Sequence, residues 1–225
     1  MSDAEPVWLG LFGAGGHARE TLPAALAMAE ARHAQGFHPD RVVFVDSTGG
    51  RRLDGALVLH EGEFLALPGR RCFAVGIGNG ESRKRVFQAA VAAGAVPVSV
   101  IAPRAAVSAA ADVAPGALIA PFAFIGPGAR IGVGFIANVF SQLSHDTQVG
   151  DFVTLSPHAS VNGNVHLGDG AVVGAGAVIR NGTPDRPLSI GVGAVVGMGA
   201  VVVTDVADGA TVAGVPARPL YRTDS

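Results

Sequence analysis

The sequence predicts a small α/β domain over residues 1–100, followed over residues 101–225 by a solenoid of short parallel strands. Two observations predict this fold. The first hundred residues alternate between apolar runs of strand length and stretches with helical character. From residue 101 onward an aliphatic residue returns at every sixth position. That period suits neither a 3.6-residue helix nor a free strand, but it suits a coil whose corners recur at a fixed phase.

The α/β region begins with an apolar strand that runs into a glycine-rich turn. Residues 7–12 have strand length, and a helix is expected from residue 18 to about residue 33. Glycines between a strand and a helix let the backbone approach a phosphate, and the helix N-terminus supplies oriented N–H groups. We therefore predict a phosphate-binding loop, while a tight turn that needs glycine would give the same pattern. The candidate residues are Gly13, Gly15, Gly16 and His17.

Two further apolar strands end in polar residues. The strand over residues 42–45 is followed by Asp46, and the strand over residues 72–77 is followed by Gly78 and Asn79. Ligands of parallel sheets lie beyond the carboxyl ends of the strands, so all three residues are candidates for nucleotide binding. A solvated loop aspartate would look the same as a ribose-binding one. A helix over residues 81–93 and a last strand over residues 96–100 complete this region.

The six-residue repeat defines the second region. Thirteen of the fourteen periodic sites from Ile101 to Ile179 are Ile, Val or Leu, and Ala137 is the exception. We expect these side chains to stack as ladders inside the coil. The interval between Ile179 and Ile190 is eleven residues instead of six. The five extra residues predict a loop that forms a lid or wall of a site.

A histidine–acid pair lies in the middle of the solenoid. His145 occupies the third position of its six-residue unit, near a corner, so its ring is expected to project outward. Histidine suits a general base because its unperturbed pKa is about 6.5, and the carboxylate of Asp146 can orient the ring. His158 and His166 follow at spacings that do not match a coil of roughly 18 residues, so no metal site is expected.

The composition argues against several classes of protein. The net charge is −2 and no basic run is present, which argues against duplex nucleic acid as a partner. No apolar run approaches the roughly 20 residues of a membrane span. Cys72 is the single cysteine, so no intrachain disulfide can form, and the N-terminus lacks the features of a signal peptide. We therefore expect a cytoplasmic protein.

Six segments in this order resemble the bacterial nucleotide-sugar acetyltransferases with hexapeptide repeats, which act in surface-glycan synthesis. That family includes N-acetyltransferases of UDP- or GDP-linked 4-amino-deoxy sugars and sialic-acid O-acetyltransferases. The resemblance extends over nearly the whole chain. Its motifs are Gly13-Ala14-Gly15-Gly16-His17, Val43-Phe44-Val45-Asp46, Gly76-Ile77-Gly78-Asn79, Ser144-His145-Asp146, Gly150-Asp151-Phe152 and Gly214-Val215-Pro216-Ala217-Arg218.

The resemblance implies a left-handed parallel β-helix, a homotrimer, and acetyl-CoA bound between neighbouring solenoids. It implies that His145 is the general base on the sugar amine, that Asp146 supports it, and that Asn138 helps to place the sugar. The glycine loop, Asp46 and Gly78–Asn79 match nucleotide-binding positions, although Ser47 replaces a second acid found in some relatives. The positions matched to CoA contacts are Thr154, which replaces a histidine of some relatives, Gly163, Gly197, Met198 and Gly199.

Three other functions fit part of the pattern. O-acetylation of a sugar or of sialic acid would use the same base and the same acetyl-CoA. A non-catalytic nucleotide-binding scaffold would use the solenoid only to form trimers. A metal-dependent enzyme similar to the γ-carbonic anhydrases would require bound zinc.

Overall fold

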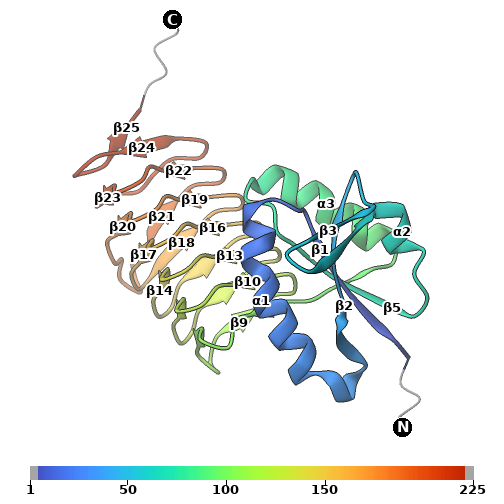
Figure 1. Ribbon diagram of the computed structural model, residues 1–225. Helices are drawn as coiled ribbons and strands as arrows, with labels where there is room; N and C mark the ends of the chain where they lie inside the picture. The colour runs from blue at the N-terminus through green and yellow to red at the C-terminus, as the bar shows by residue number, and fades with distance from the viewer. Residues whose placement is uncertain (1–4, 221–225) are drawn as a thin grey trace, which may run out of the picture. The chain divides into compact units, whose positions relative to one another are not determined.

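The computed structural model describes residues 5–220 and divides into two compact units (Figure 1). The first unit extends to Pro103 and includes Pro115–Leu118, and the second contains Arg104–Ala114 and the chain from Ile119 onward. Within residues 5–220, no helix has the length and apolar character needed to cross a membrane.

The first unit is built around a six-stranded sheet in the order β3-β4-β2-β1-β5-β6. All neighbouring strands are parallel except β3 and β4, which form an antiparallel hairpin. The strands are β1 (Val7–Phe12), β2 (Phe37–Asp46), β3 (Arg51–Leu53), β4 (Ala56–His60), β5 (Arg70–Val75) and β6 (Val96–Pro97). The helices are α1 (Gly16–Ala31), η1 (His33–Gln35), α2 (Glu61–Leu65) and α3 (Gly80–Ala92).

Both expected helices and the first three expected strands are confirmed. The strand expected over residues 96–100 is wrong as a single element, because Val96–Pro97 pairs in this sheet and Val100–Ile101 pairs in a sheet of the solenoid. The sequence did not predict the hairpin β3–β4 or helix α2. Strand β3 carries two exposed arginines, Arg51 and Arg52, and therefore has no apolar alternation to mark it as a strand. Its turn is Asp54-Gly55, and both residues have positive φ, as a two-residue hairpin turn requires. The core of the unit is aromatic: the Phe12 ring packs edge-on against Phe64 and Phe73, with centroids 5.6 and 5.7 Å apart.

The second region is a parallel β-helix whose chain visits three sheets in turn, and we call these sheets faces 1, 2 and 3. Face 1 contains β7 (Val100–Ile101), β10 (Leu118–Ile119), β13 (Ile136–Ala137), β16 (Thr154–Leu155), β19 (Val172–Val173), β22 (Val195–Val196), β24 (Thr211–Ala213) and β25 (Arg218–Pro219). Face 2 contains β8 (Ala106–Val107), β11 (Phe124–Ile125), β14 (Gln142–Leu143), β17 (Ser160–Val161), β20 (Val178–Ile179) and β23 (Val201–Val202). Face 3 contains β9 (Asp112–Val113), β12 (Arg130–Ile131), β15 (Gln148–Val149), β18 (Val165–Leu167) and β21 (Leu188–Ile190).

Before the inserted loop, strands stack in register at intervals of 18 residues, as Phe124 does on Gln142, so one coil is three six-residue units. Pairs that span the loop, such as Val178 and Val201, are 23 residues apart because the five extra residues lie between them. The periodic aliphatic residues face the interior: Ile125, Leu143, Val161 and Ile179 are fully buried on face 2. Ile101, by contrast, is 40% exposed, because its strand β7 is the last one of face 1 and no further coil covers it. The predicted ladders are therefore confirmed from the second coil onward.

Most of the corners close through one residue with positive φ, three positions after a ladder residue. We call the corner from face 1 to face 2 corner A, and the corner from face 2 to face 3 corner B. Most residues avoid positive φ, so the non-glycine residues at these positions are unusual. At corner A they form a stack of exposed rings: Phe122 lies 5.0 Å from Phe140, which lies 5.0 Å from His158. The guanidinium of Arg104 lies 5.7 Å from the Phe122 ring and continues the stack.

Candidate active site

The pair His145–Asp146 lies at corner B with both side chains open to solvent. Nδ1 of His145 lies 2.8 Å from Oδ2 of Asp146, and the two side chains are 57% and 64% exposed. Asp146 holds the positive-φ corner position, with φ 55°, and its backbone N–H donates to the carbonyl of Pro127 at 3.0 Å. The corner geometry therefore aims the carboxylate at the neighbouring ring, and the outward projection expected for His145 is confirmed.

Two glycines in the adjacent coils make room for this pair. A Cβ at Gly163, one coil above, would lie 2.5 Å from Cε1 of His145. A Cβ at Gly128, one coil below, would lie 2.5 Å from Oδ1 of Asp146. Any side chain at either position would displace its neighbour, so the imidazole lies across the backbone of Gly163. Gly163 thus has a steric role that the sequence pattern did not reveal.

The pair has the chemistry of a general base. An ionised carboxylate only accepts hydrogen bonds, so Asp146 selects the tautomer in which Nδ1 of His145 carries the proton. Nε2 then bears the free lone pair and can take a proton from a substrate. Asp146 also stabilises the imidazolium that results.

The inserted loop lies on the same corner, above the pair. The N–H of Gly182 donates to the carbonyl of Gly163 at 3.0 Å, and the N–H of Leu188 donates to the carbonyl of Asn164 at 3.1 Å. Beside this loop is a cavity of about 520 Å³. Its lining includes the guanidinium groups of Arg180 and Arg186, the loop residues Asn181 and Thr183, and Thr204 and Asp205, which follow β23 in the next coil. The loop thus forms one wall of a basic cavity on the corner that carries His145.

The remaining solenoid candidates do not gather around His145 within one chain. Asn138 lies at corner A, and strand β14 separates it from His145. Thr154 is buried on face 1. The segment Gly197–Gly199 lies at corner A and carries Met198, which is 81% exposed. The predicted site residues of the solenoid are therefore divided between two corners and one face.

The glycine loop lies at the topological switch point of the sheet in the first unit. The chain passes from β1 to β2 on one side and later reaches β5 on the other side of β1. Ligands of such sheets bind beyond the carboxyl ends of the strands at this point. The loops that follow β1 and β5, residues 13–15 and 76–79, meet there, because a Cβ at Gly13 would lie 3.2 Å from the Ile77 side chain.

The glycines at this edge divide into structural and open ones. Gly13 has φ 101°, and a Cβ at Gly76 would lie 2.6 Å from Cα of Ala18, so the fold itself requires both glycines. A Cβ at Gly15, Gly16 or Gly78 would meet no atom of the described chain within 4 Å. Gly15 is the N-cap residue of helix α1 and offers no side-chain cap, so the first N–H groups of this 16-residue helix face the open space.

Buried or hydrogen-bonded polar side chains lie beside the loops that follow β1 and β5. Arg83 is 1% exposed and donates to the carbonyls of Ile77 and Gly78 at 2.8 and 2.9 Å. Burial lowers the pKa of Arg83 to about 10, so it remains a cation at neutral pH. Burial also lowers the pKa of His17, and the nearby Glu20 opposes this effect. The side chain of Asn79 caps α3 by accepting from the N–H of Ser82 at 2.9 Å, so it has a structural role.

Asp46 lies at the end of β2, as expected, but its carboxylate is already engaged. Oδ1 accepts from the N–H groups of Thr48 and Gly49 and from the Thr48 hydroxyl, each at 2.9 Å. Oδ2 accepts from Nη2 of Arg51 at 2.5 Å. The Arg51 guanidinium, assisted by these backbone donors, holds the pKa of Asp46 well below its usual range. The sequence did not indicate Arg51 as a site residue, because strand β3, which contains it, was not predicted.

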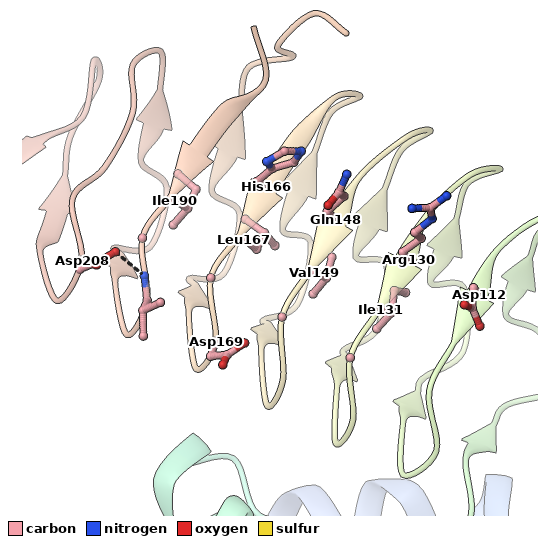
Figure 2. Close-up of a pocket in the computed structure, with 15 residues that line it drawn as sticks. Asp112, Arg130, Ile131, Gln148, Val149, His166, Leu167, Asp169, Ile190 and Asp208 are labelled. Carbon is pink, nitrogen blue, oxygen red and sulfur yellow. Dashed lines mark hydrogen bonds between the residues drawn. The ribbon is translucent and has the colours of Figure 1, made fainter. Parts of the chain in front are cut away.

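A groove of about 560 Å³ runs along face 3 and contains none of the predicted site residues (Figure 2). Its outward side chains Asp112, Arg130, Gln148 and His166 form a row of mixed polar groups across successive coils. In the part of the chain that the structure describes, no group of three or more His, Cys, Asp or Glu residues could hold a metal ion.

Two family models match the chain, one in each region. The model of the PglD N-terminal domain matches residues 9–90, and the bacterial transferase hexapeptide model matches residues 146–181. Among curated proteins, the chain is 40% identical over 216 residues to GDP-perosamine N-acetyltransferase of Escherichia coli O157:H7, which covers 95% of this chain and 96% of that protein.

Solved structures show the same architecture. WeeI from Acinetobacter baumannii AYE has a TM-score of 0.90 and 35% identity over 95% of this chain and 100% of that one. The acetyltransferase domain of PglB from Neisseria gonorrhoeae FA1090, in complex with acetyl coenzyme A, has a TM-score of 0.83 and 32% identity over 94% and 98%. PerB from Caulobacter crescentus, in complex with CoA and GDP-perosamine, has a TM-score of 0.81 and 26% identity over 95% and 97%.

The chain therefore belongs to the hexapeptide-repeat N-acetyltransferases of nucleotide-linked amino sugars. The predicted fold class, an α/β domain followed by a left-handed parallel β-helix, is confirmed, and the α/β domain is Rossmann-like.

Proposed function

We propose that this chain transfers the acetyl group of acetyl-CoA to the amino group of a GDP-linked 4-amino sugar in bacterial surface-glycan synthesis. The observation that carries the proposal is the exposed His145–Asp146 pair at corner B, with Nδ1 held by the carboxylate and Nε2 without a hydrogen-bond partner among residues 5–220. The relative at 40% identity is named for GDP-perosamine, and PerB was solved with GDP-perosamine and CoA. O-acetylation remains the alternative chemistry, and the relatives' names favour N-acetylation.

In this mechanism the neutral sugar amine attacks the thioester carbonyl while Nε2 of His145 accepts a proton from the nitrogen. The C–N bond forms, the C–S bond breaks, and the proton passes to the departing thiolate. Backbone N–H groups of the coil are suited to stabilise the developing oxyanion. Asp146 contributes by fixing the tautomer and by balancing the charge of the imidazolium.

We assign acetyl-CoA to the solenoid, residues 101–225, and the nucleotide to residues 1–100. Successive coils rise by about 4.8 Å, so the cavity beside the inserted loop begins about two coils above His145. The guanidinium groups of Arg180 and Arg186 there suit the phosphates of CoA. We propose that the rest of the CoA molecule, between its phosphates and its thioester, contacts Gly163, Thr154 and Gly197–Gly199. On the nucleotide side, the open N-terminus of α1 suits the diphosphate.

The proposed assembly is a homotrimer in which each site lies between two solenoids. Asn138 and Gly197–Gly199 lie at corner A and His145 lies at corner B, so one ligand can reach both sets if the corners come from different copies. Face 2 and corner A also carry a set of exposed apolar side chains that a second copy would cover. These are Phe122, Phe124, Phe140, Val178 and Met198, whereas the outward row of face 3 is polar.

The test is an acetyl-transfer assay on a panel of GDP-, UDP- and dTDP-linked 4-amino sugars. Release of the CoA thiol gives the rate, and mass spectrometry of the product gives the group transferred. Mild alkali cleaves an ester but not an amide, so it separates O-acetylation from N-acetylation. Thiol release that requires a 4-amino nucleotide sugar and yields an alkali-stable product supports the proposal. A product whose acetyl group is removed by mild alkali contradicts it, because that result shows transfer to a hydroxyl.

A further inference from the structure

At the end of β2, the more exposed charged side chain is that of Arg51 rather than that of Asp46. The Arg51 side chain is 43% exposed, whereas the Asp46 side chain is 19% exposed and is occupied by the turn that follows it. The end of β2 lies beside the glycine loop, because the N–H of Gly13 donates to the carbonyl of Val45 at 2.8 Å. A nucleotide whose phosphates lie at the start of α1 would therefore extend toward Arg51.

The guanidinium of Arg51 is held in a fixed plane. Nη2 donates to Oδ2 of Asp46, and Nη1 donates to the Thr48 hydroxyl and to the carbonyl of Gly49. Within residues 5–220, its Nε–H has no hydrogen-bond acceptor, so one donor edge and the planar faces remain for a ligand. A pre-ordered planar group loses little conformational entropy when it binds.

The net charge of the Asp46–Arg51 pair indicates which part of a nucleotide Arg51 contacts. Asp46 and Arg51 form an ion pair with no net charge, and the carboxylate would repel a phosphate. The helix N-terminus and the cation Arg83 provide the positive environment for phosphates instead. The base is the neutral part of a nucleotide. It suits an ion pair that has no net charge and exposes a flat guanidinium, because bases stack on the planes of arginine side chains.

We propose that Arg51 selects the nucleobase by stacking its Asp46-locked guanidinium on a purine, and so favours GDP-linked over UDP-linked sugars. This inference rests on the proposed function, because it assumes that the edge of the first unit binds a nucleotide. A purine overlaps the guanidinium plane more than a pyrimidine does, so the discrimination follows from contact area.

The experiment measures the dissociation constants of GDP and UDP by calorimetry for the wild type, Arg51→Ala, Arg51→Lys and the control Arg52→Ala. Arg52 is in the same hairpin but donates to the carbonyl of Gly55, away from the turn of Asp46. We expect Arg51→Ala to weaken GDP about tenfold and UDP much less, so that the preference for GDP is lost. Lysine keeps the charge but has no plane, so Arg51→Lys should resemble Arg51→Ala, and Arg52→Ala should resemble the wild type.

Steady-state kinetics provide the second readout. The KM for the GDP-sugar should rise in both Arg51 variants while kcat and the KM for acetyl-CoA stay unchanged. If Arg51→Lys bound GDP as tightly as the wild type, the positive charge would account for the affinity rather than the planar guanidinium. That result would overturn the inference. An equal loss of GDP and UDP affinity would also overturn it, because that result indicates a disordered turn. A wild type that binds neither nucleotide would overturn the proposed function as well, whereas GDP-sugar acetylation with an unchanged base preference would overturn this inference alone.

Discussion

At the scale of single residues, the His145–Asp146 pair carries the chemistry, and its exposure makes it testable. His145 faces away from the aliphatic ladders, so His145→Ala should leave the fold and CoA binding intact. We expect kcat to fall by roughly 10²–10⁴-fold, the usual contribution of a general base. Asp146→Asn should cost less, because it orients the base but takes no proton from the substrate. Steady-state assays on a 4-amino nucleotide sugar measure both effects, and a His145→Ala enzyme with half of wild-type turnover would remove His145 from the mechanism.

Gly163 offers a residue-scale test that does not alter the base itself. A methyl group at this position would overlap the imidazole of His145, so Gly163→Ala should rotate the ring away from Asp146. We expect kcat to fall while the KM for the nucleotide sugar changes little, since Gly163 lies in the solenoid. The control is Gly170→Ala, because alanine there strains the corner backbone at φ 66° but its added Cβ meets no described atom. Equal turnover of the two variants would contradict a steric role for Gly163.

His17 predicts a pH dependence of stability. Burial lowers its pKa in the folded state below the unperturbed value of 6.5, so the unfolded chain binds a proton more readily. The stability contribution is therefore complete above pH 6.5, and it is lost as the pH falls from 6.5 through the lower pKa of the folded state. Phenylalanine keeps a ring but does not titrate. The test measures the Tm of the wild type and of His17→Phe without ligand at pH 8 and at pH 5. On going from pH 8 to pH 5, the Tm of the wild type should fall by more than the Tm of the variant. A pH-independent difference would contradict this account.

At the scale of elements, the glycine loop before α1 tests the division of labour between the two regions. Gly15 has φ −84°, and an added Cβ meets no described atom within 4 Å, so Gly15→Val should fold normally. The valine side chain would fill the space in front of the helix N-terminus. We expect nucleotide-sugar affinity to fall markedly while acetyl-CoA affinity stays within about twofold of the wild type. Calorimetry with each ligand measures this, and equal loss of both ligands in a folded variant would contradict the assignment.

The hydrophobic periodicity and the polar residues at the ends of apolar strands predicted most of the elements. The contacts between side chains of different elements could not be predicted from the sequence. The ladders were predictable because a six-residue period has few structural solutions, and Asp46 was found because it ends an apolar strand. Its engagement by Arg51 could not be predicted, since that contact depends on a hairpin whose first strand carries arginines instead of an apolar pattern. The steric fit of Gly163 to His145 likewise joins two positions 18 residues apart, a relation that appears only once the coil is formed.

At the scale of the whole molecule, the proposed trimer accounts for the division of site residues between two corners. Asn138 and His145 lie on different corners of one solenoid, so a site between copies would take Asn138 from one subunit and His145 from its neighbour. Light scattering of the wild type should give three times the chain mass of 22.6 kDa. A monomer at micromolar concentration would contradict both the trimer and the shared site.

Complementation between inactive subunits tests the shared site directly. His145→Ala disables corner B and Asn138→Ala disables corner A, and we expect each homotrimer to have little activity. In mixed trimers co-expressed in equal amounts, some interfaces combine the intact corner B of one subunit with the intact corner A of its neighbour. Random assembly places both intact corners at about a quarter of the interfaces, so the mixture should recover about a quarter of wild-type kcat. A site built within one chain would have no intact copy in any such trimer, so activity no higher than that of the separate variants would contradict a site between subunits.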